Sequence, residues 1–238
     1  MQNLISLKKN KMNKIRKDWT DIRVNDSWAI FKIMSEFVEG YERMAKIGPC
    51  ISIFGSARTK PDNKYYQIGV EIAKKLAEAG YGVITGGGPG IMEAANKGAQ
   101  LGLGKSVGLN IDLPFEQNHN TFIDQEHNLE FDYFFVRKVI FVKYAQAFVI
   151  LPGGFGTLDE LFEALTLIQT KKINHRPVVL IGVEYWQGLL VWMKDSMLHM
   201  EQNIAEVDLD LFKLVDTADE AFKYIEDFYK SHALSPNF

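Results

Sequence analysis

The chain has 238 residues, of which 47% are hydrophobic and 24% are charged, and its formal net charge is −3. This composition is typical of a globular domain, and the small net charge gives no reason to expect a nucleic acid as a partner. No uninterrupted apolar run approaches membrane-spanning length and no signal-peptide core is present, so we expect no membrane partner. The single cysteine, Cys50, excludes an intramolecular disulfide and a cysteine-rich metal site, which favours a cytoplasmic protein.

The first 47 residues are predicted to form a basic tail and a helical extension. Residues 1–17 carry several lysines and an arginine but no acidic residue, a pattern that is usually a solvated tail. A nucleic-acid-binding arm and a transit peptide are the alternatives. Apolar residues at helical spacing then predict a helix over 18–46, which Gly48-Pro49 ends. We therefore divide the chain into the extension, 1–47, and a single domain, 48–238.

Strands and helices alternate through this domain. In chain order we expect a strand at 50–54, a helix over 65–79, a strand at 81–85, a helix over 91–101 and a strand at 106–111. A polar, irregular segment over 112–132 follows, long enough to form a lid or a binding loop. The remaining elements are a helix at 134–145, a strand at 147–151, a helix at 158–170, a strand at 177–181, a helix at 185–200, a short strand at 212–215 and a helix from a capping box at Thr217 to residue 230. The alternation predicts an α/β, Rossmann-like domain with a doubly wound parallel sheet.

A first glycine-rich loop, 86–90, follows the strand at 81–85. Its Gly-Gly-Gly-Pro-Gly run contains more glycine than a tight turn requires, which favours close approach of the backbone to a ligand. A dinucleotide-binding fingerprint would need glycine where Ile91 stands, although Asp112 lies where a ribose-binding acid is expected. An NAD-dependent oxidoreductase therefore stays an alternative. Ser56 and Arg58, after the first strand, either bind phosphate or base at the same edge or belong to a solvated turn.

A second glycine-rich loop, 152–156, separates the strand at 147–151 from a helix. A helix N-terminus that follows such a loop exposes several N–H groups and favours an anion. Thr157 and Glu160 also fit a capping box, which is the structural alternative for this segment. The preceding Pro-Gly-Gly-Phe-Gly run exceeds what a cap requires, so we favour phosphate binding.

The basic pair Arg137-Lys138 lies on an otherwise apolar helix. Taken alone, the pair is best explained by side chains that extend to solvent. The histidines show no metal-ligand spacing, and no Ser–His–Asp set can be assigned from the sequence. We therefore assign no metal site and no catalytic triad from these residues.

Together, these segments resemble the Lonely Guy (LOG) family of cytokinin-activating phosphoribohydrolases, long labelled "lysine decarboxylase-like". The resemblance covers roughly residues 50–200 and depends on the 86–94 segment, on Arg137-Lys138 and on the Pro-Gly-Gly-x-Gly-Thr-x-x-Glu signature that ends at Glu160. The first loop is one residue shorter than in plant-type members of the family. This shorter loop resembles that of a longer bacterial branch, whose N-terminal helical extension matches the helix predicted over 18–46. No lysine stands out as an anchor for pyridoxal phosphate, so the decarboxylase label has no support.

The resemblance implies hydrolysis of the N-glycosidic bond of a purine nucleoside 5′-monophosphate, AMP or an N6-substituted AMP, to free base and ribose 5-phosphate. It implies that Arg137 and Glu160 are catalytic, that no metal or redox cofactor is required, and that the family's typical homodimer, or a higher oligomer, forms. The residues implied to bind phosphate or ribose are Gly55, Ser56, Gly87, Gly88, Gly90, Met92, Lys138, Gly153, Gly154, Gly156 and Thr157. The alternative is a non-catalytic carrier of a nucleotide or of the molybdenum cofactor on the same fold, against which the Arg137/Glu160 pair argues.

Overall fold

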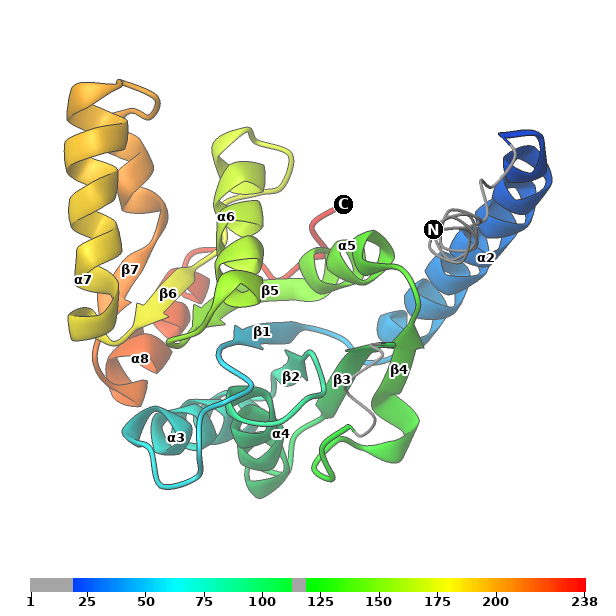
Figure 1. Ribbon diagram of the computed structural model, residues 1–238. Helices are drawn as coiled ribbons and strands as arrows, with labels where there is room; N and C mark the ends of the chain where they lie inside the picture. Colours follow the sequence, from blue (N-terminus) through cyan, green and yellow to red (C-terminus); the bar gives the residue numbers. More distant parts are fainter. Residues whose placement is uncertain (1–18, 113–118) are drawn as a thin grey trace, which may run out of the picture.

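The computed structural model describes residues 19–112 and 119–238, so the predicted basic tail lies outside the described residues. A central parallel sheet carries helices on both faces (Figure 1). The elements in chain order are α2 (Trp19–Ala45), β1 (Cys50–Phe54), α3 (Lys64–Glu78), β2 (Gly82–Thr85), α4 (Ile91–Leu101), β3 (Ser106–Ile111), η1 (Gln125–His127), β4 (Asn128–Phe131), α5 (Phe134–Tyr144), β5 (Ala145–Ile150), α6 (Phe155–Gln169), β6 (Val178–Ile181), α7 (Val183–Trp192), η2 (Met193–Met200), η3 (Glu206–Leu211), β7 (Lys213–Val215) and α8 (Ala218–Tyr229).

The strands follow the order β4-β3-β2-β1-β5-β6-β7, and every pair is parallel. The chain builds the sheet outward from β1 in one direction and then returns to continue from β5 in the other. This confirms the doubly wound α/β fold predicted from the sequence. The order reverses between β1 and β5, and such a switch point leaves a crevice at the carboxyl ends of the strands.

Each face of the sheet is covered by its own set of helices. Ile72 of α3, Ile91 of α4 and Ile225 of α8 lie in the apolar cluster on one face. Phe141 of α5 and Leu161 of α6 lie in the cluster on the other face. Four of the five inner strands, β1, β2, β5 and β6, are buried along their whole length, which explains why the sequence shows continuous apolar runs there.

The helical extension predicted at residues 18–46 is confirmed as α2, which projects from the rest of the molecule (Figure 1). Its C-terminal end packs on the domain, because Met44 is fully buried in the apolar cluster and Arg43 donates to the carbonyl of Asn128 at 2.8 Å. The division of the chain at residue 47 stays a prediction. In the described part of the chain, every helix is too short or too polar to cross a bilayer.

Three local predictions differ from the structure. The segment predicted to be irregular contains a short edge strand, β4, paired with β3. Helix α6 starts at Phe155, three residues before the predicted start. The helix predicted to run from 185 to 200 is α-helical only to Trp192 and continues with the wider π-type hydrogen bonding of η2.

Candidate functional site

A cleft of about 1320 Å³ opens at the carboxyl edge of the sheet, over the switch point between β1 and β5. Its walls include the segment after β1, the glycine loop after β2, the start of α6 and one side of α5. Both predicted glycine loops therefore face one cavity, which is large enough for a nucleotide-sized ligand.

The first glycine loop packs closely against the segment that follows β1. Gly90 has a φ of +69°, and a Cβ added there would lie 2.4 Å from the carbonyl oxygen of Ser56. That carbonyl also accepts the N–H of Ile91 at 3.0 Å. Gly90 is therefore required by backbone conformation and by the approach of two backbone segments.

Three buried polar side chains hold the back of this loop. Asn120 donates its side-chain amide to the carbonyls of Gly87 and Gly88, each at 3.0 Å, and its own backbone N–H donates to Gly87 at 2.8 Å. The side-chain oxygen of Asn96 accepts from Asn120 at 2.9 Å and from the Thr85 hydroxyl at 2.6 Å. The loop conformation is thus fixed by the interior of the protein and not by a ligand.

The second glycine loop leads into α6 through Gly153 and Gly154. A Cβ at Gly153 would lie 2.0 Å from the Thr157 hydroxyl oxygen, so this glycine is required by packing. By contrast, a Cβ at Gly154 or Gly156 would meet no described atom within 4 Å, and neither glycine has a positive φ. Both line the cleft, so neither the packing nor the backbone conformation of the described residues requires glycine at these two positions.

The capping-box interpretation of Thr157 and Glu160 is wrong. Helix α6 begins at Phe155 with Gly154 as its N-cap, and no side chain caps it in the described part of the chain. Thr157 is therefore the third residue of the helix and not its cap. The N-terminus of α6 opens into the cleft, where its N–H groups and the helix dipole favour an anion.

Glu160 lies on the second turn of α6 and lines the cleft, although its residue surface is only 8% exposed. Burial raises the pKa of its carboxyl to about 7, because a charged carboxylate is poorly solvated there. The positive charges of Lys138 and Arg137 oppose this shift, whereas Glu163 and Asp159 add to it. A carboxyl that changes its charge near neutral pH is a typical feature of a catalytic group.

Arg137 reaches the cleft from α5. Its guanidinium lies over the ring of Phe134, with 4.9 Å to the ring centroid, and within 5.7 Å of the centroid of Phe141. The interpretation of this residue as a surface cation is therefore wrong, because its side chain lies against aromatic rings inside the cleft.

Lys138 lies outside the cleft lining, although it follows Arg137 in the sequence. Its ammonium forms ion pairs with Asp159 at 2.8 Å and with Glu163 at 3.1 Å, and its side chain is mostly buried. Lys138 therefore joins α5 to α6 and reaches Glu160 through its electrostatic field.

The structure brings most of the predicted site residues together. Those that line the cleft are Gly55, Ser56, Gly87, Gly88, Met92, Arg137, Gly154, Gly156, Thr157 and Glu160. Gly90, Gly153 and Lys138 do not line it; they pack behind the loops or between the helices. Arg58, on the segment after β1, and Asp112, after β3, also line the cleft.

Several lining residues were not predicted. Asn110, at the end of β3, and Glu130, on β4, lie on the cleft wall because β4 extends the sheet beyond β3. Two exposed aromatic residues also line the cleft: Phe155, which is 93% exposed, and Phe134, which is half-exposed. The only sequence signal for β4 is a four-residue alternation of polar and apolar residues.

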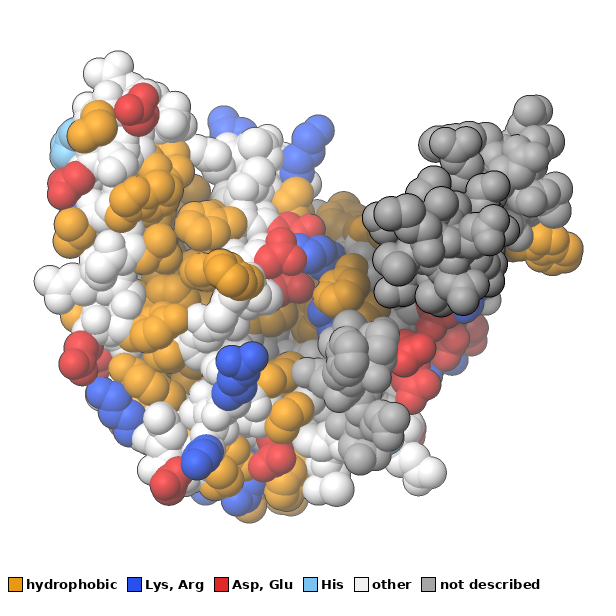
Figure 2. Space-filling view, in the orientation of Figure 1, with side chains coloured by type: hydrophobic (Ala, Val, Ile, Leu, Met, Phe, Trp, Pro, Cys, Tyr) orange, Lys and Arg blue, Asp and Glu red, His pale blue; other side chains and the backbone are white. Residues whose placement is uncertain are grey.

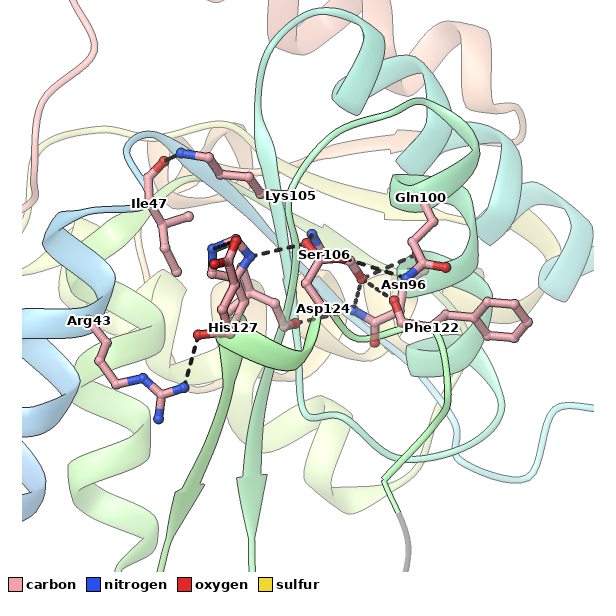
Figure 3. Close-up of polar contacts among 11 residues, drawn as sticks. Arg43, Ile47, Asn96, Gln100, Lys105, Ser106, Phe122, Asp124 and His127 are labelled. Carbon is pink, nitrogen blue, oxygen red and sulfur yellow. Dashed lines mark hydrogen bonds and ion pairs between the residues drawn. The ribbon is translucent and has the colours of Figure 1, made fainter.

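A Ser–Asp–His cluster lies at the other end of β3 (Figure 3). Asp124 accepts the backbone N–H of Ser106 at 2.8 Å and contacts His127 at 3.1 Å. The Ser106 hydroxyl donates to the carbonyl of Phe122 at 2.6 Å. These bonds anchor the segment between β3 and β4, and the buried serine is a structural residue, not a nucleophile.

Comparison with known proteins gives matches in sequence and in structure. Residues 92–225 match the model of a family described as "Possible lysine decarboxylase". A protein of Oryza sativa subsp. japonica named "Probable cytokinin riboside 5′-monophosphate phosphoribohydrolase" is 31% identical over 63% of the chain and 60% of its own length. A cytokinin riboside 5′-monophosphate phosphoribohydrolase of Arabidopsis thaliana is 26% identical over 76% of the chain and 84% of its own length.

Among solved structures, the molybdenum cofactor binding protein of Rippkaea orientalis superposes with a TM-score of 0.56 at 20% sequence identity. The superposition covers 76% of the chain and 98% of that protein. At this identity the likeness shows the fold alone.

Proposed function

The chain belongs to the Lonely Guy (LOG) family, and from this premise we propose that it hydrolyses the N-glycosidic bond of a purine nucleoside 5′-monophosphate. The substrate proposed is AMP or an N6-substituted AMP, and the products are the free base and ribose 5-phosphate. One observation carries the proposal: a buried carboxyl with a pKa near 7, Glu160, shares a cleft with Arg137 and two glycine loops.

Glu160 is proposed to act at the sugar. Cleavage of a glycosidic bond passes through a state in which the anomeric carbon gains positive charge. A carboxylate in a poorly solvated site stabilises such charge strongly, and it also accepts a proton from an attacking water. Burial of Glu160 in the cleft wall supports either role, and both require the ionised form.

Arg137 is proposed to act on the opposite side of the scissile bond. Its guanidinium stays charged at all accessible pH values and is held over Phe134. In this position it orients the nucleotide and stabilises negative charge on the departing base. Phe134 and Phe155 both line the cleft and present exposed aromatic surface, which is suited to stacking against a purine.

The phosphate is proposed to bind at the N-terminus of α6, beside Gly154, Gly156 and Thr157, with the loop at Gly88 completing the pocket. The open space over Gly154 and Gly156 supports this proposal. Binding the phosphate away from the reacting bond supplies energy that positions the C1′ atom against Glu160. No step of this scheme uses a metal or a redox cofactor.

The test is chromatography of the free base released from a panel of nucleoside 5′-monophosphates by the wild type and by Glu160→Gln. We expect Glu160→Gln to lose turnover while it still binds nucleotide. Glu163→Gln is the matched control, because Glu163 lies on the same helix and pairs with Lys138 without lining the cleft. Unchanged turnover in Glu160→Gln would remove this residue from the mechanism.

The alternative is a non-catalytic carrier of a nucleotide or of the molybdenum cofactor. The likeness to a molybdenum cofactor binding protein is consistent with it, but that likeness extends only to the fold. Tight ligand binding without release of base from any nucleotide would favour the carrier. An NAD-dependent oxidoreductase, the further alternative from the sequence, would show a change in cofactor absorbance or fluorescence on titration.

We also propose that the chain forms a homodimer or a higher oligomer in the cytoplasm. Hydrophobic side chains gather over α6 and α7 in Figure 2, and Tyr185, Trp192 and Phe155 are among the exposed residues there. On the projecting α2, Trp28 and Phe31 are also exposed. Light scattering coupled to gel filtration measures the oligomeric state directly.

A further inference from the structure

We propose that Asn120 and Tyr185 are positioning residues that direct the N–H groups of Gly88 and Gly154 into the cleft toward the phosphate of the ligand. This inference rests on the proposed function, since it concerns how the same cleft binds a phosphate. Neither side chain lines the cleft, so neither touches the ligand. Each acts on a glycine loop from behind.

Tyr185, on α7, holds the second loop. Its hydroxyl donates to the carbonyl of Gly153 at 2.5 Å. In the described part of the chain every peptide bond is trans, so a carbonyl and the N–H that follows it point in opposite directions. Because the Gly153 carbonyl is turned toward α7, the N–H of Gly154 is turned to the other side of the peptide, and Gly154 lines the cleft.

Asn120 does the same for the first loop. It binds the Gly87 carbonyl with both its backbone and its side-chain N–H groups, so that carbonyl faces the interior. The N–H of Gly88 therefore points away from Asn120, on the side where Gly88 lines the cleft. The next peptide offers no donor because its nitrogen belongs to Pro89, which leaves the N–H of Gly88 as the donor that Asn120 controls.

Asn120 is itself held at a fixed position. Its side chain also donates to Asn96, whose amide donates to the Ser106 hydroxyl at 2.9 Å. A few residues further on, Asp124 is anchored by Ser106 at the start of β3 and by Gln100 near the end of α4 (Figure 3). The loop therefore has its donors oriented before a ligand arrives, which reduces the entropy lost on binding.

The test is calorimetric titration with AMP, GMP and the matching nucleosides, which isolates the contribution of the phosphate. Tyr185→Phe removes one hydroxyl from a half-exposed side chain. Asn120→Asp replaces the amide donor by an oxygen that repels the two carbonyls. If this variant does not fold, Asn120→Ser, which adds no charge, is used instead. We expect each variant to raise the Kd of the nucleotides on the order of tenfold and that of the nucleosides less than twofold.

Two matched controls make the same kinds of bond far from the cleft. The Tyr229 hydroxyl donates to the carbonyl of Gln146 at 2.6 Å, and Asn237 donates to the carbonyl of Ala145 at 2.9 Å, both at the opposite end of β5. Tyr229→Phe and Asn237→Asp (Asn237→Ser where Asn120→Ser is used) should leave the ratio of nucleoside to nucleotide Kd unchanged. A general loss of structure would weaken both ligand classes together.

The inference is overturned if the ratio of nucleoside Kd to nucleotide Kd in the Tyr185 and Asn120 variants equals that of the wild type. A parallel rise of both Kd values leaves this ratio unchanged and therefore has the same meaning. The inference also fails if the wild type binds nucleotides no more tightly than nucleosides. Base release is measured separately. A changed ratio of Kd values without release of base would reject the proposed hydrolysis alone. Release of base with an unchanged ratio of Kd values would reject this inference alone.

Discussion

Glu160 on α6 lies within electrostatic reach of Arg137 on α5, and both side chains line the same cleft. Burial raises the pKa of the Glu160 carboxyl, while the charges of Lys138 and Arg137 lower it. The balance leaves the pKa at about 7, so the ionisation of this group changes across the neutral range. The consequences for activity and for stability have opposite signs.

The activity should fall as the pH is lowered through 7. The proposed roles of Glu160 require its carboxylate, so kcat/KM should show an acid limb with an apparent pKa near 7 in the free protein. Rates of base release from AMP between pH 5 and 9 measure this limb. The control Glu163→Gln should retain the acid limb. If kcat/KM of the wild type instead falls as the pH rises above 7, Glu160 would act as a proton donor.

The stability of the fold should change in the opposite direction, because the contribution of Glu160 to the free energy of unfolding rises as the pH is lowered through 7. The folded protein holds a proton on Glu160 up to about pH 7, whereas the unfolded chain releases it near the ordinary value of 4.5. Between these values the native state binds more protons, so this group lowers the free energy of unfolding as the pH rises. Glu160→Gln removes the effect, and its stability relative to the wild type should be roughly 2–3 kcal/mol greater at pH 8 than at pH 5.

Urea unfolding at the two pH values measures this difference. Glu163→Gln is again the control, because it removes an ion pair with Lys138 and should gain no stability at pH 8. The contrary result is a difference in free energy of unfolding between Glu160→Gln and the wild type that is the same at pH 5 and at pH 8. It would show that the carboxyl is not held in a poorly solvated site.

The alternation of buried strands and amphipathic helices was sufficient to predict the parallel sheet, because each inner strand is a continuous apolar run. The two glycine loops could be predicted to share a cleft because both follow strands of one parallel sheet. Edge strand β4 escaped prediction because only Leu129 and Phe131 face the interior, a repeat too short to recognise.

The residues behind the loops could not be predicted either. Asn120 donates to the carbonyls of Gly87 and Gly88, more than 30 positions earlier in the chain, and Tyr185 donates to the carbonyl of Gly153 at a similar separation. No local pattern marks such contacts, since they depend on how the segment after β3 and helix α7 pack against the sheet. For the same reason the local Thr157–Glu160 spacing indicated a cap that the longer helix does not form.

Substitutions at two glycines of the second loop should separate binding from stability. Gly156→Ala adds a methyl group where no described atom lies within 4 Å, and it replaces glycine inside α6. We expect the free energy of unfolding to rise by about 0.5 kcal/mol or more, because alanine loses less entropy in a helix. Nucleotide affinity should fall, since the methyl group occupies the space proposed for the phosphate.

Gly153→Ala is the matched comparison. Its methyl group would lie 2.0 Å from the Thr157 hydroxyl, so we expect a loss of about 1–3 kcal/mol in stability. Thermal unfolding and calorimetric titration with AMP measure both quantities for each variant. A Gly156→Ala variant that binds AMP as tightly as the wild type would show that the ligand does not approach α6 at this position.

Substitution of the two neighbouring cations should separate an electrostatic role from a contact with the substrate. Arg137 and Lys138 both lower the pKa of Glu160, so Arg137→Gln and Lys138→Gln should each move the acid limb of kcat/KM to higher pH. The two variants should differ on the alkaline plateau, where Glu160 is ionised in both. Lys138 lies outside the cleft lining, so Lys138→Gln loses no contact with the reacting atoms. Once Glu160 is ionised, the kcat/KM of this variant should therefore reach a plateau within about threefold of the wild type.

Arg137 lies in the cleft, and loss of its guanidinium should lower the plateau about 10²-fold, the size of effect expected when a group that stabilises developing charge is removed. Full pH profiles of base release for the two variants and the wild type measure the limb and the plateau together. A plateau for Arg137→Gln equal to that of Lys138→Gln would mean that Arg137 acts only through its field on Glu160. In that case the departing base must be stabilised by another group on the cleft wall.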